Sequence, residues 1–344
     1  MRIGYAGYSP QNDSIADRRR LLYWARVRGH EVVDSRDPRA DLIVVTSSAD
    51  LGYWARAHSK VPIVLDIVDG LIGEQSNTRD LLRGYAHWAT RKFSGAYPRR
   101  FSNMLYSVAK KSNRIICSSE EQISAWKKSG FQSLDILDFH VELPKLGPRI
   151  STPETDPIEI FWEGLPATLG SMHLLNGVFE SENFQDIQLN ILTNLNAYKY
   201  MNAYKKIDVK ETILNQISSN KIKVNLTQWD PEKVVENALR SVLGVIPLSH
   251  KSSYNHLKAE NRLLIMWRLG LPVLTSPLPS YVRTMRLAKI DGICEDKAEW
   301  NRKFKLLVGS HELQSEVIAK STDYLEKFHS EEELLLKWDS ALSF

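Results

Sequence analysis

The chain has 344 residues, of which 43% are apolar and 25% charged, and this composition is typical of a globular protein long enough for two α/β domains. No apolar run approaches the roughly 20 residues that span a bilayer, and Cys117 and Cys294 lack the spacing of a disulfide framework or a zinc site. The first residues lack the apolar stretch of about 7–15 residues of a secretory signal, so a cytoplasmic protein is expected.

The positive charge is concentrated in the first part of the chain. Residues 1–150 carry 23 Lys and Arg against 16 Asp and Glu, and the remainder carries 22 against 25. Nine of the basic residues lie within 74–114, interleaved with six aromatic residues. Such a stretch can lie on the inner face of an anionic membrane or hold an anionic acceptor. The alternative is a pair of solvated amphipathic helices whose aromatic residues face the core. No signature of a nucleic-acid-binding motif is present, so no nucleic-acid partner is expected.

In the first half, short apolar runs alternate with amphipathic segments of helical length, which predicts a parallel sheet wrapped by helices. The expected strands are 1–5, 31–34, 42–46, 61–68 and 114–117. The expected helices are 18–28, 51–58, most of 77–111, and 120–128. Residues 143–157 hold four prolines and one glycine, a density that discourages both helix and strand, so they are expected to form a linker.

The second half repeats the alternation and predicts a second α/β domain. Its expected strands are 158–162, 188–193, 223–226, 242–248 and 272–275, and its expected helices are near 170–179, 206–218, 232–241 and 259–269. Two helices are expected to close the chain, the last with a capping box formed by Ser330 and Glu333.

In doubly wound sheets, ligands bind beyond the carboxyl ends of the strands, where helix N-termini point inward. The polar loop 247–257 follows such a strand, and a helix is expected to open near Lys258. Lys258 and Arg262 are four residues apart and would share one helical face, with Asn261 adjacent. Two cations at a helix N-terminus suit a diphosphate and can neutralise it without a metal ion. The alternative is a solvated basic turn.

Three further positions at strand ends are candidates for the same donor site. Gly164 would let the backbone approach a ligand closely, or would form a plain tight turn. Trp229 could stack on a nucleobase or belong to the core, and Thr193 could reach a phosphate.

The first domain offers candidates for catalysis and for acceptor binding. Asp66 and Asp69 close an expected strand, and one of them could orient or deprotonate an acceptor hydroxyl. The alternative is that they cap the following turn. Ser14 and Arg18 open the first helix and could hold an acceptor phosphate or carboxylate.

Several motifs are absent from the sequence. It has no Asp-x-Asp motif of metal-dependent nucleotide-sugar enzymes, no Gly-x-Gly-x-x-Gly and no P-loop. Neither a bound metal, a redox dinucleotide nor NTPase activity is therefore expected.

Together the segments 116–123, 161–164, 246–248, 258–262 and 270–276 resemble the GT-B glycosyltransferases, and are most similar to glycosyltransferase family 4. The resemblance implies two Rossmann-like α/β domains facing a cleft. Residues 1–145 would bind the acceptor, 155–315 would bind a nucleotide sugar, and 316–344 would be helices that cross back to the first domain. Lys258 and Arg262 would then bind donor phosphates, and Gly164 would lie beside the donor.

The implied activity is metal-independent transfer of a hexosyl group, with retention, from a nucleotide sugar to a glycan or lipid-linked acceptor in cell-surface polysaccharide synthesis. No cofactor besides the donor is implied. The sequence departs from family 4 at the two usual glutamates, whose places hold Leu257 and Ile265, and Glu260 is out of register. A non-catalytic nucleotide-sugar-binding module and a nucleotide-sugar 2-epimerase are the alternatives.

Overall fold

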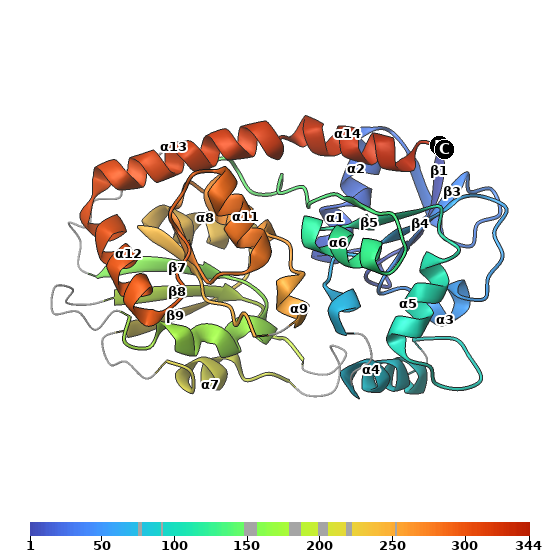
Figure 1. The fold of residues 1–344 in the computed structure, drawn as a ribbon, viewed down its shortest axis with the longest axis horizontal. Helices are drawn as coiled ribbons and strands as arrows, with labels where there is room; N and C mark the ends of the chain where they lie inside the picture. The colour runs from blue at the N-terminus through green and yellow to red at the C-terminus, as the bar shows by residue number, and fades with distance from the viewer. Residues whose placement is uncertain are drawn as a thin grey trace. The chain divides into compact units, whose positions relative to one another are not determined.

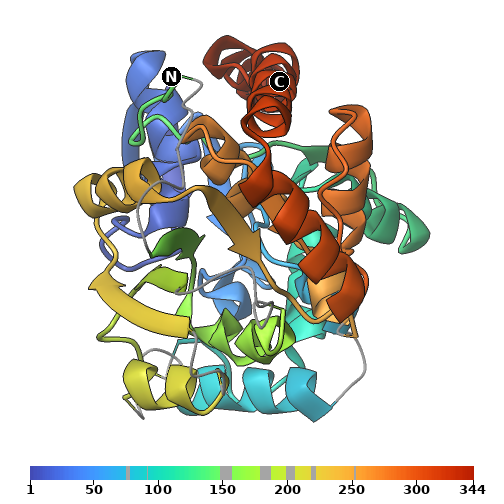
Figure 2. The ribbon, with the colours of Figure 1, turned by 90° about the vertical axis from the view of Figure 1, so that its left-hand side faces the viewer.

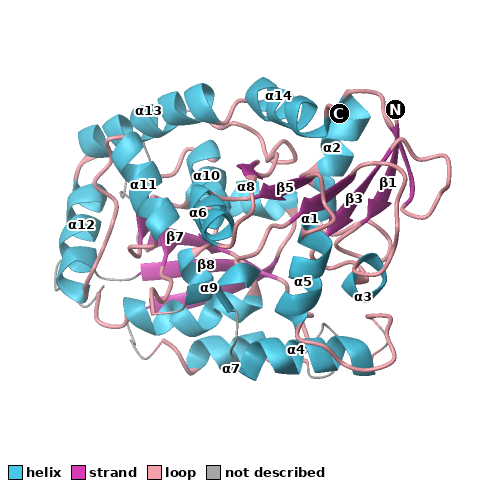
Figure 3. Ribbon diagram, turned by 45° about the vertical axis from the view of Figure 1, so that its right-hand side comes forward, coloured by secondary structure: helices cyan, strands magenta, loops and turns pink. Residues whose placement is uncertain are grey.

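The computed structural model describes residues 1–74, 78–90, 92–147, 157–178, 187–198, 206–217, 222–251 and 253–344. The chain divides into two compact units. Unit 1 comprises Met1–Val141, Ser252–Ala259 and His329–Phe344, and unit 2 comprises Glu142–Lys251 and Glu260–Phe328. Each unit has one sheet of parallel strands with helices around it (Figures 1 and 3). The predicted α/β class, with two Rossmann-like sheets, is confirmed.

The sheet of unit 1 has the strand order β2-β1-β3-β4-β5-β6. Its strands are β1 (Arg2–Ala6), β2 (Glu31–Asp34), β3 (Leu42–Thr46), β4 (Ile63–Asp66), β5 (Arg114–Cys117) and β6 (Leu134–Asp135). β3 and β4 are buried along their whole length, as expected for central strands of a parallel sheet covered on both faces. The strand order reverses between β1 and β3, so the carboxyl ends of these two strands form the topological switch point of unit 1.

The helices of unit 1 are shorter and more numerous than the sequence indicated. They are α1 (Ile15–Arg18), α2 (Leu21–Val27), α3 (Leu51–Trp54), the 3-10 helix η1 (Leu71–Glu74), α4 (Thr78–Ala89), α5 (Phe101–Ala109), α6 (Glu120–Lys128), α9 (Ser253–His256) and α14 (Glu331–Leu342). The expected helical stretch 77–111 is divided into α4 and α5, because Gly95 and Pro98 lie in the intervening loop and disfavour a helix.

The last helix, α14, packs on α2 in unit 1. The indole rings of Trp24 and Trp338 lie 6.2 Å apart, and Nε1 of Trp24 donates a hydrogen bond of 2.7 Å to Asp339. Ser330 is the N-cap, and its hydroxyl accepts a hydrogen bond from the backbone N–H of Glu333. The contact buries the apolar face of α14 against unit 1.

The sheet of unit 2 has the order β11-β10-β7-β8-β9, with all neighbours parallel. The strands are β7 (Ile158–Glu163), β8 (Ile187–Thr193), β9 (Ile222–Gln228), β10 (Leu243–Ile246) and β11 (Val273–Thr275). In chain order this is the 3-2-1-4-5 arrangement of the Rossmann fold, whose order reverses between the first and fourth strands. The switch point of unit 2 therefore lies between β7 and β10.

The helical elements of unit 2 surround this sheet, as seen in Figure 2. They are η2, a 3-10 helix (Pro166–Leu175), α7 (Val209–Leu214), α8 (Pro231–Arg240), α10 (Asn261–Arg268), α11 (Pro279–Leu287), α12 (Lys297–Gly309) and α13 (His311–Phe328). Four helices, rather than the expected two, follow the last strand within the described segment 276–344. Of the expected linker, residues 148–156 lie outside the described residues. None of the helices in the described ranges is both long enough and apolar enough to cross a bilayer.

Candidate functional site

The switch point of unit 2 brings together residues that are far apart in the sequence. β7 ends at Glu163 and is followed directly by Gly164, whereas Arg262 is the second residue of α10, the helix that follows β10 and α9. Arg262 lies against the turn at the end of β7, because a β-carbon added at Gly164 would lie 2.6 Å from Cζ of Arg262. The glycine therefore provides the space that the guanidinium occupies.

The guanidinium of Arg262 is held by several neighbours within unit 2. Its Nη2 donates a hydrogen bond of 3.2 Å to the hydroxyl of Thr168, and its Nε lies 3.9 Å from Oε1 of Glu163. Its Cζ lies 5.2 Å from the ring centroid of Trp162, which is within the range of a cation–π contact. Only 13% of the side chain is exposed, and Nη1 has no hydrogen-bond partner among the described residues. Arg262 therefore combines a fixed position with one unused donor group.

Thr193 and Trp229 complete this end of the sheet. Thr193 is fully buried, and its hydroxyl donates a hydrogen bond of 2.6 Å to the carbonyl oxygen of Gly164. It therefore holds the turn that faces Arg262. Trp229 follows β9, is half-buried, and its Nε1 donates a hydrogen bond of 3.3 Å to Oε2 of Glu163. One face of the site is thus built from an indole and a carboxylate.

The start of the following helix differs from the expectation. α10 begins at Asn261, with Glu260 at the N-cap, and not near Lys258. Glu260 is buried and accepts hydrogen bonds from Nη2 of Arg283 and the hydroxyl of Thr284, and these contacts fix it at the helix start. The expectation that Lys258 and Arg262 share one face of a helix is therefore wrong, whereas Asn261 and Arg262 do form the first turn.

Lys258 lies in the segment Ser252–Ala259, which belongs to unit 1. Its ammonium nitrogen lies 5.4 Å from the ring centroid of Tyr254, in range of a cation–π contact. The same segment is tied to α6, because Nε2 of Gln122 and the hydroxyl of Ser119 both donate hydrogen bonds to the carbonyl oxygen of Leu257. Both donors belong to the N-cap and first turn of α6, so the position of Lys258 depends on unit 1.

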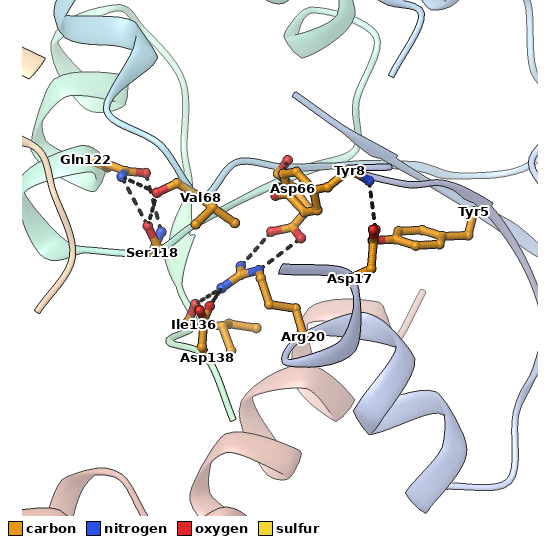
Figure 4. Close-up of polar contacts among 10 residues, drawn as sticks. All are labelled: Tyr5, Tyr8, Asp17, Arg20, Asp66, Val68, Ser118, Gln122, Ile136 and Asp138. Carbon is orange, nitrogen blue, oxygen red and sulfur yellow. Dashed lines mark hydrogen bonds and ion pairs between the residues drawn. The ribbon is translucent and has the colours of Figure 1, made fainter. Parts of the chain in front are cut away.

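A buried ion pair lies at the carboxyl end of β4 in unit 1 (Figure 4). Arg20 donates to both carboxylate oxygens of Asp66, with Nη2–Oδ1 at 2.6 Å and Nε–Oδ2 at 3.1 Å, and both side chains are fully buried. Nη1 of Arg20 also reaches Oδ1 of Asp138 and the carbonyl oxygen of Ile136. Burial alone would lower the pKa of Arg20, but the Asp66 carboxylate raises it well above its usual value. Asp66 therefore acts as the internal partner of a buried arginine.

Tyr5, Tyr8 and Asp17 form a second cluster beside this pair (Figure 4). Oδ1 of Asp17 accepts hydrogen bonds of 2.7 Å from the hydroxyl of Tyr5 and from the backbone N–H of Tyr8. The hydroxyl of Tyr8 donates to the carbonyl oxygen of Asp66 at 3.0 Å. Burial raises the pKa of both tyrosines, so both remain neutral donors. The turn after β1 is thereby connected to the end of β4.

The two acceptor candidates at the first helix lie next to this cluster. Ser14 is the N-cap of α1, and its hydroxyl both accepts from the backbone N–H of Asp17 and donates to its carboxylate. Arg18 is exposed, and its Nη1 donates a hydrogen bond of 2.6 Å to the carbonyl oxygen of Asp13. Ser14 thus has a local capping role, while Arg18 presents its charge at the surface.

Asp69 differs from Asp66, because β4 ends at Asp66 and the chain then leaves the sheet. Asp69 is exposed, and its Oδ1 accepts a hydrogen bond of 2.7 Å from the hydroxyl of Tyr254. Gly70, beside it, lies against the main chain of Tyr254, so a side chain at position 70 would not fit. A solvent-accessible carboxylate is therefore held in place by a tyrosine of the short helix α9.

Sequence reasoning missed three residues that the structure places beside predicted ones. Glu163 and Thr168 contact Arg262, and Tyr254 contacts Asp69. Glu163 could have been noticed, because it ends the first strand of a Rossmann-like unit. The sequence carries no signal for the other two, since Thr168 lies in the 3-10 helix η2, before the helix expected near 170–179, and Tyr254 lies in the four-residue helix α9, which the sequence did not predict.

Comparison with solved structures shows which fold these two units form. An alpha-glucosyltransferase (AGT) in complex with UDP matches with a TM-score of 0.59 and 10% identity, and the match covers 99% of each chain. The T4 phage BGT in complex with UDP-glucose matches with a TM-score of 0.56 and 14% identity over the whole of both chains. TarM matches with a TM-score of 0.58 and 12% identity over 88% of this chain, which spans only 55% of the TarM chain. These similarities confirm the expected GT-B fold.

No family model matches the sequence, and no curated protein matches it either. The expected membership of glycosyltransferase family 4 therefore stays a prediction.

Proposed function

We propose that this chain is a glycosyltransferase that transfers a hexosyl group from a nucleotide diphosphate sugar, held by unit 2, to a glycan or lipid-linked acceptor. The observation that carries the proposal is the position of the Arg262 guanidinium over Gly164 at the switch point of unit 2. Rossmann-like units bind nucleotides at this place. The similar folds of proteins solved with UDP and UDP-glucose support the same choice.

Arg262 would stabilise the negative charge that develops on the departing nucleotide diphosphate. A guanidinium that is already fixed by Thr168 and Trp162 needs little reorganisation during the reaction, which is how electrostatic stabilisation becomes effective. Its Nη1 is buried without a hydrogen-bond partner among the described residues and would donate to a phosphate oxygen of the donor. Because this cation serves the leaving group, the proposed reaction needs neither a metal ion nor a cofactor besides the donor. Lys258, which the sequence predicted to bind the donor, belongs to unit 1 and stays a prediction.

Glu163 is proposed to contact hydroxyl groups of the donor. A carboxylate accepts hydrogen bonds from a ribose or a sugar, and Glu163 is held beside Trp229, on which a base could stack. Leu257 and Ile265 occupy the places of the two glutamates usual in family 4 and cannot accept such bonds. Glu163 would supply the carboxylate that Leu257 and Ile265 lack.

Asp69 is the proposed catalytic carboxylate of unit 1. It is exposed, whereas both oxygens of Asp66 are taken by Arg20, so Asp69 is the better placed of the two predicted aspartates to meet an acceptor hydroxyl. Asp66 would then position the end of β4 from which Asp69 follows. Retention of configuration and a role in cell-surface polysaccharide synthesis are carried over from the family resemblance.

The proposal can be tested in two steps. First, a panel of nucleotide diphosphates and nucleotide sugars is screened by thermal shift, since a ligand present at 100 times its Kd raises the free energy of unfolding by about 2.7 kcal/mol. Second, the stabilising donor is incubated with glycan and lipid-linked acceptors, and the product is identified by mass spectrometry and NMR. The Asp69→Asn variant should lose transfer while it still binds the donor.

Three outcomes would contradict the proposed glycosyltransferase activity. Conversion of the soluble donor alone, without an acceptor, would indicate an epimerase. Donor binding without transfer to any acceptor would indicate a non-catalytic module. Absence of stabilisation by any nucleotide would overturn the proposed donor site.

A further inference from the structure

Helix α4 in unit 1 has its polar residues on the inside. Asp80 is only 2% exposed, and its carboxylate accepts hydrogen bonds of 2.7 Å from both the backbone N–H and the hydroxyl of Ser102 in α5. One turn later, Gly84 is buried against the main chain that leads into α5. After it comes His87, whose ring stacks on Phe93 with 4.3 Å between the centroids. This inner face is fully used by contacts within unit 1.

The outward face of α4 is apolar. Leu81 is 51% exposed, Leu82 is 65% exposed and Tyr85 is 54% exposed. Tyr97, in the loop between α4 and α5, is 63% exposed. An ordinary surface helix buries its leucines, whereas α4 exposes Leu81 and Leu82 and buries Asp80. Apolar side chains that are exposed together on one helix and its loop mark an interaction surface.

Basic residues accompany this apolar face. Arg79 on α4 and Lys92 and Arg99 in the loop that follows are exposed, and Arg100 is half-buried. Within residues 78–100 the single acidic residue, Asp80, is buried, and the carboxylate of Asp50 is bound to Ser94 of the loop. The partner of the face therefore has both apolar and negatively charged groups.

A cavity of about 310 Å³ opens in unit 1 between α3, α5 and the same loop. Its lining includes the aromatic residues Trp88, Phe93 and Tyr97 and the guanidinium groups of Arg56 and Arg99. Aromatic rings beside cations are suited to the boundary of a bilayer, where headgroup phosphates lie next to acyl chains.

We propose that the outward face of α4 and the 92–100 loop form a membrane-docking surface that inserts Leu81, Leu82 and Tyr85 into the headgroup region of an anionic bilayer. The basic residues around them contact the lipid phosphates. For residues 74–114 the sequence left a membrane contact, an anionic acceptor and a pair of solvated helices open, and the proposal assigns the membrane contact to this face. This inference goes beyond the proposed function and does not rest on it, because it concerns unit 1 alone.

The test is co-sedimentation of the whole chain with vesicles. Binding is expected to vesicles of phosphatidylglycerol and phosphatidylcholine and to be at least tenfold weaker with phosphatidylcholine alone. The double variant Leu81→Ser, Leu82→Ser is expected to lose about tenfold or more in partitioning. Lys92→Glu together with Arg99→Glu is expected to weaken binding and to reduce its dependence on salt.

Matched controls keep the result specific. Leu239→Ser changes a leucine that is 46% exposed on α8 of unit 2 and should leave vesicle binding unchanged. All the substituted side chains except Arg99 lie away from the cavity, and thermal melts of each variant confirm folding. UDP binding measured on the same variants separates a failure of this surface from a failure of the donor site.

Absence of binding to anionic vesicles at low salt, or equal binding by wild type and the leucine variant, overturns the proposal. Dimerisation abolished by the leucine substitutions would also overturn it.

Discussion

Gly164 and Arg262 occupy adjoining space at the switch point of unit 2, so that a β-carbon at position 164 would lie 2.6 Å from Cζ of Arg262. The two residues are about a hundred positions apart in the sequence, and only the parallel sheet brings them together. The absence of a side chain at Gly164 therefore determines where the guanidinium of Arg262 lies.

Gly164→Ala is expected to displace the Arg262 guanidinium and weaken UDP binding by about tenfold, which corresponds to the loss of about 1.4 kcal/mol of a charge-assisted contact. Gly164 also has a φ of 157°, which alanine rarely adopts, so the free energy of unfolding should fall as well, by about 1–3 kcal/mol. Isothermal titration calorimetry with UDP, together with a thermal melt, measures both quantities. Unchanged affinity would show that the position of Arg262 does not matter for binding.

Arg262→Ala is expected to weaken UDP binding by about 1.5–3 kcal/mol, because a fixed cation no longer meets the diphosphate. The matched control is Arg240→Ala in α8, an arginine of the same unit whose side chain is 47% exposed and paired at the surface. The control should bind UDP like the wild type. If both variants bind alike, the phosphate assignment is wrong.

Asp66→Asn is expected to destabilise unit 1 by about 3–5 kcal/mol, because it leaves the buried guanidinium of Arg20 without its main counter-charge. Arg39→Ala removes a largely exposed arginine paired with Asp37, so its effect should lie within about 1 kcal/mol. Unfolding in urea measures both variants. A loss for Asp66→Asn as small as that of the control would contradict the structural role given to Asp66.

His87 provides a pH-dependent prediction. Burial, together with the nearby charges of Lys92 and Arg83, lowers its pKa from 6.5 to about 4. Between these values the unfolded chain binds a proton and the folded chain does not, so the free energy of unfolding should fall as the pH is lowered from about 6.5 towards 4. His87→Phe keeps a ring against Phe93 and should remove this part of the pH dependence. Urea titrations at pH 7 and pH 4.5 test it, and an equal loss in both proteins would assign the effect to other groups.

The sequence alone predicted the class of the fold and most of its strands. Expected strands at 31–34, 42–46 and 114–117 coincide with β2, β3 and β5, and the helix 120–128 coincides with α6. Such elements are specified locally, by short apolar runs and by caps such as Ser119, whose hydroxyl accepts from the N–H of Gln122. Local patterns also named Gly164 and Arg262 as candidates for one donor site.

Other features of the fold depend on contacts between residues that are distant in the sequence, and only the tertiary structure shows them. Arg20 pairs with Asp66, 46 positions away, and is the N-cap of α2, so the helix expected at 18–28 begins at Leu21. The tie of Glu260 to Arg283 and Thr284 moves the start of α10 past Lys258. The inward position of Asp80 turns the leucines of α4 outward. A sequence pattern indicates which residues could be buried. It does not indicate which charged side chains have a partner inside the fold, because the partners are distant in the sequence. Burial of a charged side chain without a partner costs too much free energy, so the three-dimensional packing decides which of them are buried.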